Sequence, residues 1–587
     1  MPMTGRDFRI FLALASCVAC YLIARAAFVP WVHDECASLF WYAGPGEFLP
    51  PHAHADANNH ILSSALGALF LRLCGLSLLA SRLGSLLAFG LYAFAAWRLG
   101  AYVRSALLRW CLWSVLLFCP FLFEFFALFR GYALELAFLA VALEGGLRWV
   151  RTRSILSFAQ MLGGIALADL SVLALVPLWA GLIVGLATML LFGRRGYPQR
   201  TFLLHVAHWS ILGLLPLLWG VDMAFDLRAK GLLYHGSTAG LLPVTIASLN
   251  TLVLGGDAPI ARLAVVLFAL FPLGVTVALK AWRRPLGIVS GALLLDVLLR
   301  IALARLLDVN YPEDRAALHL LWLALIAVLL ALDEVSSIRP QARWLGTLLF
   351  LLPLRSLLAV NIDSTSLWPE QSVPERFLVR LDEMQRRAGR PLVVGAYHQL
   401  AFTIPYMARY LGLPPICPHA EHFPEGTDDV RIVDDRFLAA ASMGFMEVDA
   451  SPPNHLHFMV RTEPVRNGPL LAYTTIQGDP RAENFEVWAT RADHRVYVVE
   501  VRCLLPTEGL LQDLLLVAAS QDAEGNDLTY EAVHPAVVDL ARTDGHYTMA
   551  FRFDPLAGAT KHLVYFWNGT DRAVPIEALD IRVSELN

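Results

Sequence analysis

Charged residues are scarce in this chain of 587 residues. They make up 16% of it, and hydrophobic residues make up 57%, whereas soluble proteins carry about 25% charged residues. The shortage is confined to residues 8–360, where apolar runs are broken only by short polar stretches. No basic tract suggests a nucleic-acid partner, and the sequence contains no nucleotide-binding signature.

Other familiar patterns are missing as well. The eight cysteines have no metal-binding spacing, and the sequence shows no internal repeat. No small-residue cleavage site follows the first apolar run, Ile10–Val29, which Arg6 and Arg9 precede. We therefore expect an uncleaved first membrane helix.

Long apolar runs dominate the first 360 residues. A helix needs about 20 apolar residues to cross the hydrocarbon core, where its backbone must satisfy its own hydrogen bonds. The apolar segment His60–Cys74 is short and is expected at the membrane interface. We predict about eleven transmembrane helices, at residues 9–29, 77–97, 110–127, 131–147, 155–172, 173–192, 201–221, 259–280, 286–306, 315–332 and 344–360.

Basic residues between these runs indicate the orientation, because short cytoplasmic loops are rich in lysine and arginine. Arg6 and Arg9 place the N-terminus on the cytoplasmic side of the membrane. With the spans alternating from there, Asp222 and Asp226 are expected in a loop on the outer side. The strongest basic clusters all fall on the inner side, among them Arg98, Arg104, Arg109, Arg148, Arg151, Arg194, Arg195, Lys280, Arg283 and Arg284. The part of the chain after residue 360 is therefore expected outside the cytoplasm.

Two patterns follow residue 360. Residues 375–390 look helical, and Pro391–Ala396 reads as a short apolar strand. From about residue 487, apolar and polar residues alternate in short runs separated by turn residues, as in Val496–Arg502. We predict a transmembrane domain at 1–360, an extracytoplasmic mixed α/β segment at 361–486 and a β-sandwich-like domain at 487–587.

Two adjacent carboxylates, Asp34 and Glu35, follow the first predicted span. A solvated loop end is the simpler interpretation for such a pair, but aromatic residues such as Trp31 and Phe40 surround it and suggest partial burial. A carboxylate held there can serve as a general base toward a hydroxyl. Adjacent side chains seldom face the same way, so we expect one to react and the other to orient or bind.

The same loop continues with three histidines and an aspartate, His52, His54, Asp56 and His60. These side chains are of the types that hold a divalent metal, although their spacing is loose. The alternative is a polar interfacial loop, in which an asparagine before His60 caps the following apolar helix.

Three arginines fall at the outer membrane face in this topology: Arg82, Arg130 and Arg315. Arginine near lipid is costly and marks function or an interfacial anchor. A guanidinium can hold a phosphate through two hydrogen bonds. Each arginine alone is read as an anchor, whereas three together near a carboxylate loop favour a phosphate site.

Two further features concern acids within predicted spans. Asp296 and Arg300 lie four residues apart and therefore face the same side of their helix, which predicts an internal ion pair. Asp169 lies near the outer end of its span and is expected to be exposed.

Several motifs resemble those of the GT-C superfamily of polyprenyl-phosphate-sugar-dependent glycosyltransferases, in the branch of the protein O-mannosyltransferases and the lipid A aminoarabinose transferase. The resemblance rests on Asp34-Glu35 after the first span, Asn58–Leu62 at a helix start, Leu69–Gly75 with Ala80–Leu83, and Arg130–Leu134. It covers residues 8–360 and depends on the order of these motifs. The family's His-Pro-Pro element is absent, and Arg315-Ala316 stands where an Arg-Tyr is usual.

The resemblance implies an inverting glycosyltransferase of the bacterial inner membrane. It would move a sugar from a polyprenyl-phosphate carrier to an extracytoplasmic glycan, lipid or protein acceptor. Asp34 is then the general base and Glu35 its catalytic partner. The expected substrate-binding residues are Asn59, His60, Arg82, Arg130, Tyr132 and Arg315.

Two other functions remain open at the level of sequence. A transporter or flippase of lipid-linked glycans has ionisable residues near the bilayer midplane and related halves, and here only Asp296 and Arg300 fit the first condition. A non-catalytic scaffold would present a glycan-binding outer domain and would tolerate the loss of Asp34.

Overall fold

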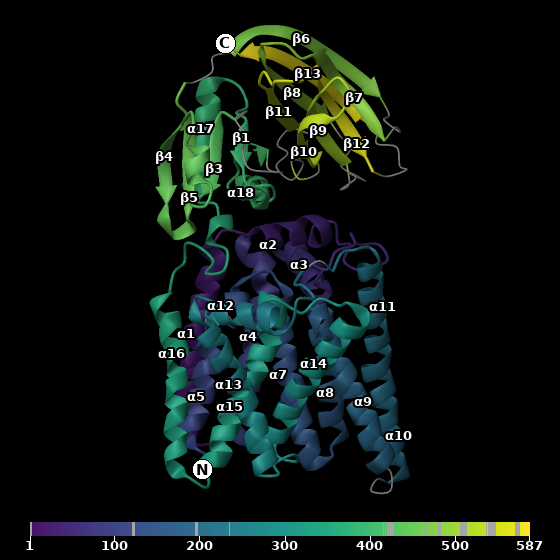
Figure 1. Cartoon of the computed structure of the whole chain (residues 1–587), viewed down its shortest axis with the longest axis vertical. Coiled ribbons are helices and arrows are strands. Elements are labelled where there is room, and N and C mark those ends of the chain that lie inside the picture. Colours follow the sequence, from purple (N-terminus) through teal and green to yellow (C-terminus); the bar gives the residue numbers. More distant parts are fainter. Residues whose placement is uncertain are drawn as a thin grey trace. The chain divides into compact units, whose positions relative to one another are not determined.

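The computed structural model describes residues 3–119, 122, 124–193, 198–233, 235–414, 416, 418–419, 428–463, 467–478, 483–504, 514–535, 537, 547–569 and 576–586. The chain forms two compact units (Figure 1). The helical unit comprises Met1–Ala27 and Trp41–Ile362. The β-containing unit comprises Phe28–Phe40 and Asp363–Asn587. The segment Phe28–Phe40, predicted as part of the transmembrane domain, thus packs with the C-terminal residues.

The helical unit is a bundle whose long helices run side by side (Figure 1). Among the described residues, seven helices are long and apolar enough to cross a membrane. A multi-pass membrane protein is thereby confirmed, whereas the count of eleven spans is not. The helices are α1 (Gly5–Phe28), α3 (Ile61–Cys74), α4 (Leu78–Leu99), α5 (Ala106–Phe118), α7 (Gly131–Thr152), α8 (Ile155–Ser171), α9 (Val176–Gly193), α10 (Gln199–His208), α11 (Leu215–Ala229), α12 (Ala247–Leu254), α13 (Pro259–Ala278), α14 (Pro285–Leu307), α15 (Leu318–Ser336) and α16 (Leu351–Leu358).

Some predicted spans have different ends in the structure. Helix α5 stops at Phe118, before the predicted end at residue 127. The last predicted span consists of a 3-10 segment, Pro340–Phe350, followed by the short helix α16. Asp222 and Asp226 lie within α11 rather than in a loop, because α10, a π-helical segment and α11 together form an apolar helical run of 31 residues.

Loops that the sequence predicts on the same side of the membrane contact the same residues at one end of the bundle. Arg104 Nη2 and Arg284 Nη1 both contact Glu334 Oε2, at 2.9 Å and 2.6 Å. At the other end, His60 Nδ1 bonds to the carbonyl of Ser171 at 2.8 Å. These contacts bring together segments far apart in sequence and agree with the predicted alternation of inner and outer loops.

The β-containing unit begins with a five-stranded sheet of order β2-β1-β3-β5-β4 (Figure 1). Strands β1, β2 and β3 are parallel, whereas β5 pairs antiparallel with β3 and β4. Helix α17 buries Phe377, Leu378 and Leu381 on one face and ends at Gly389, which has φ +64°. The elements are β1 (Val394–Ala396), β2 (Pro418–His419), β3 (Val430–Asp434), β4 (Phe445–Ser451), β5 (Leu456–Arg461), α2 (His33–Ser38), α17 (Glu375–Ala388), α18 (Thr403–Tyr410) and α19 (Leu438–Ala441).

A β-sandwich follows in the same unit, as predicted for the fold class. Its two sheets have the orders β10-β9-β12-β7 and β11-β8-β13-β6. The first strand starts at Asn467, before the predicted start near residue 487. The strands are β6 (Asn467–Gly478), β7 (Asn484–Arg491), β8 (Val496–Leu504), β9 (Leu514–Gln521), β10 (Asp527–Val533), β11 (Tyr547–Phe553), β12 (Lys561–Asn568) and β13 (Ile576–Leu586).

Both faces of strand β8 carry buried side chains, each packed against a different part of the unit. Tyr497, Val499 and Val501 point into the core between the two sheets, because successive side chains of a strand face opposite ways. Val498, on the other face, is also buried and packs with Val393 beside β1. The sandwich and the mixed sheet therefore share a hydrophobic contact within this unit.

A charged cluster joins β5 to its neighbours. His457 Nε2 lies 2.7 Å from Asp435 Oδ1, and His457 Nδ1 lies 2.7 Å from Glu447 Oε2. Partial burial lowers the pKa of His457, but the hydrogen bonds to the two carboxylates outweigh it, and the pKa is raised. The hydrogen bond from His457 lowers the pKa of Asp435.

The raised pKa of His457 predicts a pH-dependent stability. Its contribution is fully present below the unfolded-state pKa of about 6.5 and is lost as the pH rises through the folded-state pKa. We expect the β-containing unit to unfold at a lower urea concentration as the pH is raised from 6 to 9. Limited proteolysis of the full chain in urea measures this unfolding. His457→Gln should flatten this fall, whereas His494→Gln should not. An equal fall in wild type and His457→Gln would contradict the assignment.

Candidate functional site

A cavity of about 390 Å³ lies in the helical unit. Its walls come from α7, the turn between α8 and α9, α9, α11, α14 and the loop before α15. Most of the lining is apolar; the apolar residues include Val176, Pro177, Ala180, Val221, Ala224, Phe225, Leu299 and Leu303. Such a cavity, with few polar groups on apolar walls, is the usual form of a ligand site.

The polar lining includes three arginines. They are Arg228 on α11, Arg300 on α14 and Arg315 before α15. Two acids, Glu313 and Asp314, line it as well. With all five groups ionised, the lining carries a net positive charge, which favours an anionic ligand.

Arg300 is held rigidly in the cavity wall. Its Nε donates to Asp296 Oδ2 at 3.0 Å, and its Nη2 donates to the carbonyl of Ala174 at 2.7 Å. The ion pair predicted from the four-residue spacing of Asp296 and Arg300 is therefore present. His319 Nε2 lies 2.9 Å from Arg300 Nη2. A buried guanidinium requires such partners, because its desolvation is costly.

Three of the predicted substrate-binding residues, His60, Tyr132 and Arg315, line the cavity. The His60 ring lies edge-on to the Tyr132 ring, with the centroids 5.1 Å apart. Gly131 permits this packing, because a Cβ atom there would lie 2.0 Å from the carbonyl oxygen of Ser171. The Arg-Gly-Tyr motif thus has a local steric reason for its glycine.

Arg130 and Arg82 are buried side chains that bind other parts of the protein. Arg130 donates to Asn58 Oδ1, and Arg82 Nη1 donates to the carbonyl of Ala26 at 3.3 Å. Both are at most 1% exposed. Within the described part of the chain, neither of them lines the cavity, and neither does Asn59.

The asparagines before α3 do not cap it, contrary to the sequence expectation. His60 is the N-cap residue, and no side chain accepts a hydrogen bond from the first turn. Asn58 instead accepts from Arg130, and Asn59 Nδ2 donates to the carbonyl of Phe48 at 3.0 Å. The side-chain amides of both asparagines therefore bind residues distant in sequence, rather than the backbone N–H groups of the helix that a local capping rule predicts.

The two carboxylates of the first loop lie on α2 in the β-containing unit. Glu35 is fully buried, and its Oε2 accepts from the backbone N–H of Val32 at 3.1 Å, which closes the first turn of α2. Asp34 is half-buried. The two adjacent carboxylates therefore differ in their burial.

Helix α2 is anchored at the carboxyl end of the parallel strand β1. The N–H of His33 donates to Gln371 Oε1 at 3.1 Å, and His33 Nδ1 donates to the carbonyl of Gln399 at 3.0 Å. Gln371 Nε2 in turn donates to Gln399 Oε1 at 3.0 Å. Residue 399 follows β1 directly, at the edge where α/β sheets place their ligand crevices.

The side chains of the histidine-rich loop that starts at His52 do not converge on a single metal site. His54 stacks on Trp41 with the ring centroids 3.9 Å apart, and Asp56 Oδ1 accepts from the N–H of Asn58 at 2.8 Å. No group of three or more metal-ligating side chains with suitable geometry occurs among the residues described.

The sequence interpretation missed four polar groups of this site: Arg228, His235, Glu135 and His319. The first two line the cavity, and the last two are fully buried beside Arg300. Glu135 lies in an apolar helical run, and a carboxylate within such a run is a signal that could have found it.

The expectation that Asp169 is exposed was wrong. Its exposed fraction is 3%. Helix α8 packs here against α11 at Gly220, where a Cβ atom would lie only 2.8 Å from Asp169 Oδ2. The missing side chain of Gly220 leaves the room in which this carboxylate is buried.

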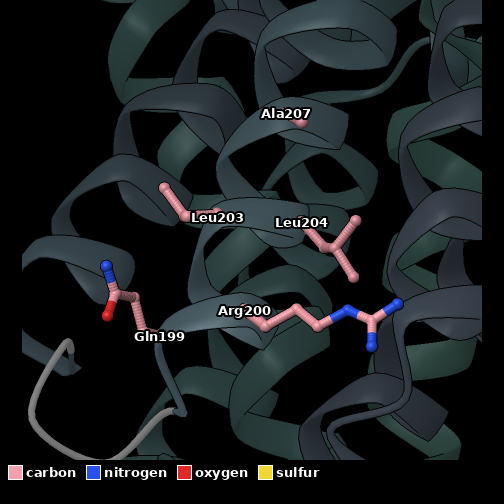
Figure 2. A pocket seen from close by; sticks show the side chains of 5 residues that line it. All are labelled: Gln199, Arg200, Leu203, Leu204 and Ala207. Atoms are coloured by element: carbon pink, nitrogen blue, oxygen red, sulfur yellow. The ribbon is translucent and has the colours of Figure 1, made fainter.

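A second hollow lies on α10 and is lined by Gln199, Arg200, Leu203, Leu204 and Ala207. Figure 2 shows these side chains along a single helix, with Arg200 and Leu204 directed to the same side. Both leucines are exposed. Exposed leucines on a membrane helix are lipid-facing surface, so this hollow is not a candidate site.

No protein-family model matches the chain, and no curated protein matches it. Solved structures match it loosely. ArnT from Cupriavidus metallidurans bound to undecaprenyl phosphate has 13% identity and a TM-score of 0.44, over 78% of this chain and 98% of that one. AglB from Archaeoglobus fulgidus, in complex with an inhibitory peptide and a dolichol-phosphate, has 10% identity and a TM-score of 0.38, over 98% of each chain.

The arabinosyltransferase EmbB from Mycobacterium smegmatis has 11% identity and a TM-score of 0.31, over 100% of this chain and 66% of that one. Likenesses this loose do not carry a function over to the chain, which must be argued from its own residues.

The anchoring of α2 generates a prediction. Trp31 is fully buried and lies edge-on to Tyr406 and Tyr410, with centroids 6.2 Å and 5.7 Å away. Trp31→Ala should destabilise the docked segment by about 3–5 kcal/mol, since a large buried aromatic side chain is lost. Hydrogen exchange of residues 28–40 should then accelerate. Trp41→Ala, outside the segment, is the control. Unchanged exchange in Trp31→Ala would show that other contacts suffice.

Proposed function

We propose that the chain is an inverting glycosyltransferase that takes a sugar from a polyprenyl-phosphate carrier and transfers it to an acceptor hydroxyl or amine. In this proposal it lies in the bacterial inner membrane and acts on the extracytoplasmic side. The observation that carries the proposal is the cavity of the helical unit, with its apolar walls and three guanidiniums. A lipid phosphate has the matching parts: an apolar tail and an anionic head.

The phosphate is the leaving group, and it gains negative charge as the bond to the sugar breaks. Cations fixed before the reaction stabilise that charge without reorganising, which is usually a large part of the catalytic effect. Arg300 meets this demand best, because Asp296 and the Ala174 carbonyl hold its guanidinium in place. Arg315 and Arg228 supply further positive charge in the same lining.

In the proposal, His60 and Tyr132 contact the sugar of the donor, and neighbouring residues support them. Both side chains line the cavity and offer an imidazole and a phenol to the donor's sugar. Arg130 supports this wall through Asn58, two residues before His60. Arg82, bound to the carbonyl of Ala26, and Asn59, bound to that of Phe48, act in the same supporting way.

The acceptor must lose a proton when its oxygen or nitrogen attacks the sugar. Asp34 accepts this proton in the proposal, because its neighbour Glu35 is buried and engaged with the N–H of Val32. Glu35 orients Asp34 by closing the turn of α2. A single displacement of this kind inverts the configuration at the sugar carbon.

One observation favours a second function. Glu135, Asp296, Arg300 and His319 are ionisable groups buried among membrane helices, as in proton-coupled transporters. A flippase for lipid-linked glycans would use them to move the carrier rather than to cleave it. It would release no free polyprenyl phosphate, so the product of the reaction distinguishes the two functions.

Replacing the proposed base tests the chemistry. The purified full chain, given polyprenyl-phosphate sugars and acceptors extracted from host membranes, should release free polyprenyl phosphate, detected by mass spectrometry. Asp34→Asn should lower the rate about 10²- to 10⁴-fold, the usual contribution of a general base. Glu47→Gln, an exposed acid of the same loop, is the control. A wild-type rate in Asp34→Asn would exclude this residue as the base.

Replacing the cavity arginines tests donor binding. Arg300→Gln and Arg315→Gln should each weaken binding of undecaprenyl phosphate at least about 10-fold, because hydrogen bonds to a charged group contribute about 1.5–3 kcal/mol. Native mass spectrometry of the detergent-solubilised chain provides the affinity. Arg262→Gln, whose guanidinium pairs with Asp257 outside the cavity, should bind normally. Equal affinity in all three variants would overturn the phosphate site.

A further inference from the structure

Four ionisable side chains from three helices meet behind the cavity wall. They are Glu135 on α7, Asp296 and Arg300 on α14, and His319 on α15. The exposed fraction is 0% for Glu135, Asp296 and His319, and 7% for Arg300. Of these four, only Arg300 lines the cavity. We call them the arginine-support network.

The network has a defined hydrogen-bond geometry. His319 Nδ1 lies 3.2 Å from Glu135 Oε1, and His319 Nε2 lies 3.2 Å from Asp296 Oδ2. The same Nε2 is 2.9 Å from Arg300 Nη2, which can only donate. His319 thus lies between the carboxylates of Glu135 and Asp296 and against the guanidinium of Arg300.

Glu135 contacts the Nδ1 side of the His319 ring, and Arg300 contacts the Nε2 side. Glu135 can therefore act on the guanidinium only through the position of the imidazole. Asp296 meanwhile accepts from Arg300 Nε at 3.0 Å, and the Ala174 carbonyl accepts from Nη2 at 2.7 Å. With Nε and Nη2 bound inside the protein, Nη1 is the guanidinium nitrogen left to meet a ligand in the cavity.

The location of the network argues for a role beyond holding helices together. Burying several charges in a low-dielectric interior costs several kcal/mol per ion, and apolar residues would pack the helices at least as well. The ion pairs at the end of the bundle are different, because Arg104 and Arg284 there are about half exposed. A fully buried network that ends in one cavity-lining cation is typical of a functional site.

We propose that Glu135 and His319 are positioning residues that set the orientation of the Arg300 guanidinium, and through it the affinity for the phosphate of the donor lipid. This inference rests on the proposed function, in which Arg300 binds that phosphate. Neither residue touches the ligand. Their effect should therefore disappear once the guanidinium is removed, whereas a purely structural effect should remain.

A double-mutant cycle separates these cases, with undecaprenyl phosphate as the probe and the full chain in detergent. Glu135→Leu should weaken binding by about 3- to 30-fold, in the range of coupling energies for contacting residues. Glu135→Gln keeps a polar side chain of the same shape beside His319 and should recover most of the affinity. The double variant Glu135→Leu/Arg300→Gln should bind no more than about 2-fold worse than Arg300→Gln alone.

Glu144→Gln provides the matched control. Glu144 is a buried acid on the same helix, α7, and pairs with Arg98 and Arg148 away from the cavity. It should leave the affinity unchanged. Should Glu135→Leu fail to fold, His319→Asn replaces it in the cycle with the same expectation.

The outcomes distinguish the inference from the function on which it rests. If Arg300→Gln binds undecaprenyl phosphate like wild type, the proposed phosphate site is overturned. If Arg300→Gln loses binding while Glu135→Leu and His319→Asn do not, the phosphate site stands and the positioning role is overturned. Additive losses in the double variant overturn it as well, because they show an effect independent of the guanidinium.

Discussion

A guanidinium inside a bundle of apolar helices is stable only when the protein itself supplies its hydrogen-bond partners. Arg300 obtains them from Asp296 on its own helix, from the carbonyl of Ala174 and from His319 on α15. Of these partners, Ala174 is 126 residues away from Arg300 along the chain. The need to satisfy this one cation therefore determines how α14, α15 and the turn before α9 meet, and it places the cation in the wall of the cavity.

In the proposed function, each unit meets a different chemical demand of glycosyl transfer. The helical unit holds the cations that suit an anionic leaving group, together with apolar walls that suit a lipid. The β-containing unit holds Asp34, on a short helix anchored to the carboxyl end of a parallel strand. The proposal thus assigns the donor to one unit and the proton transfer to the other.

Burial separates supporting residues from those that can meet a substrate. Arg82 and Arg130 have the residue type and the position expected of phosphate ligands, yet each donates to a neighbouring segment of the protein. Glu35 is likewise engaged with the backbone of its own turn. Arg315 and the half-buried Asp34 remain at accessible places. The same residue types therefore differ in burial from one position to the next.

The sequence by itself determined the membrane character, the β-sandwich and the Asp296–Arg300 pair, because each depends on a local pattern: long apolar runs, period-two alternation and a four-residue spacing. The tertiary structure alone decided that Glu135 and His319 stand behind Arg300, that Phe28–Phe40 packs with the C-terminal unit, and that the asparagines before α3 bind other partners than the helix. Local periodicity reports which face of a helix is buried. It does not report which distant segment covers that face, and this pairing is set by side-chain packing across the whole fold.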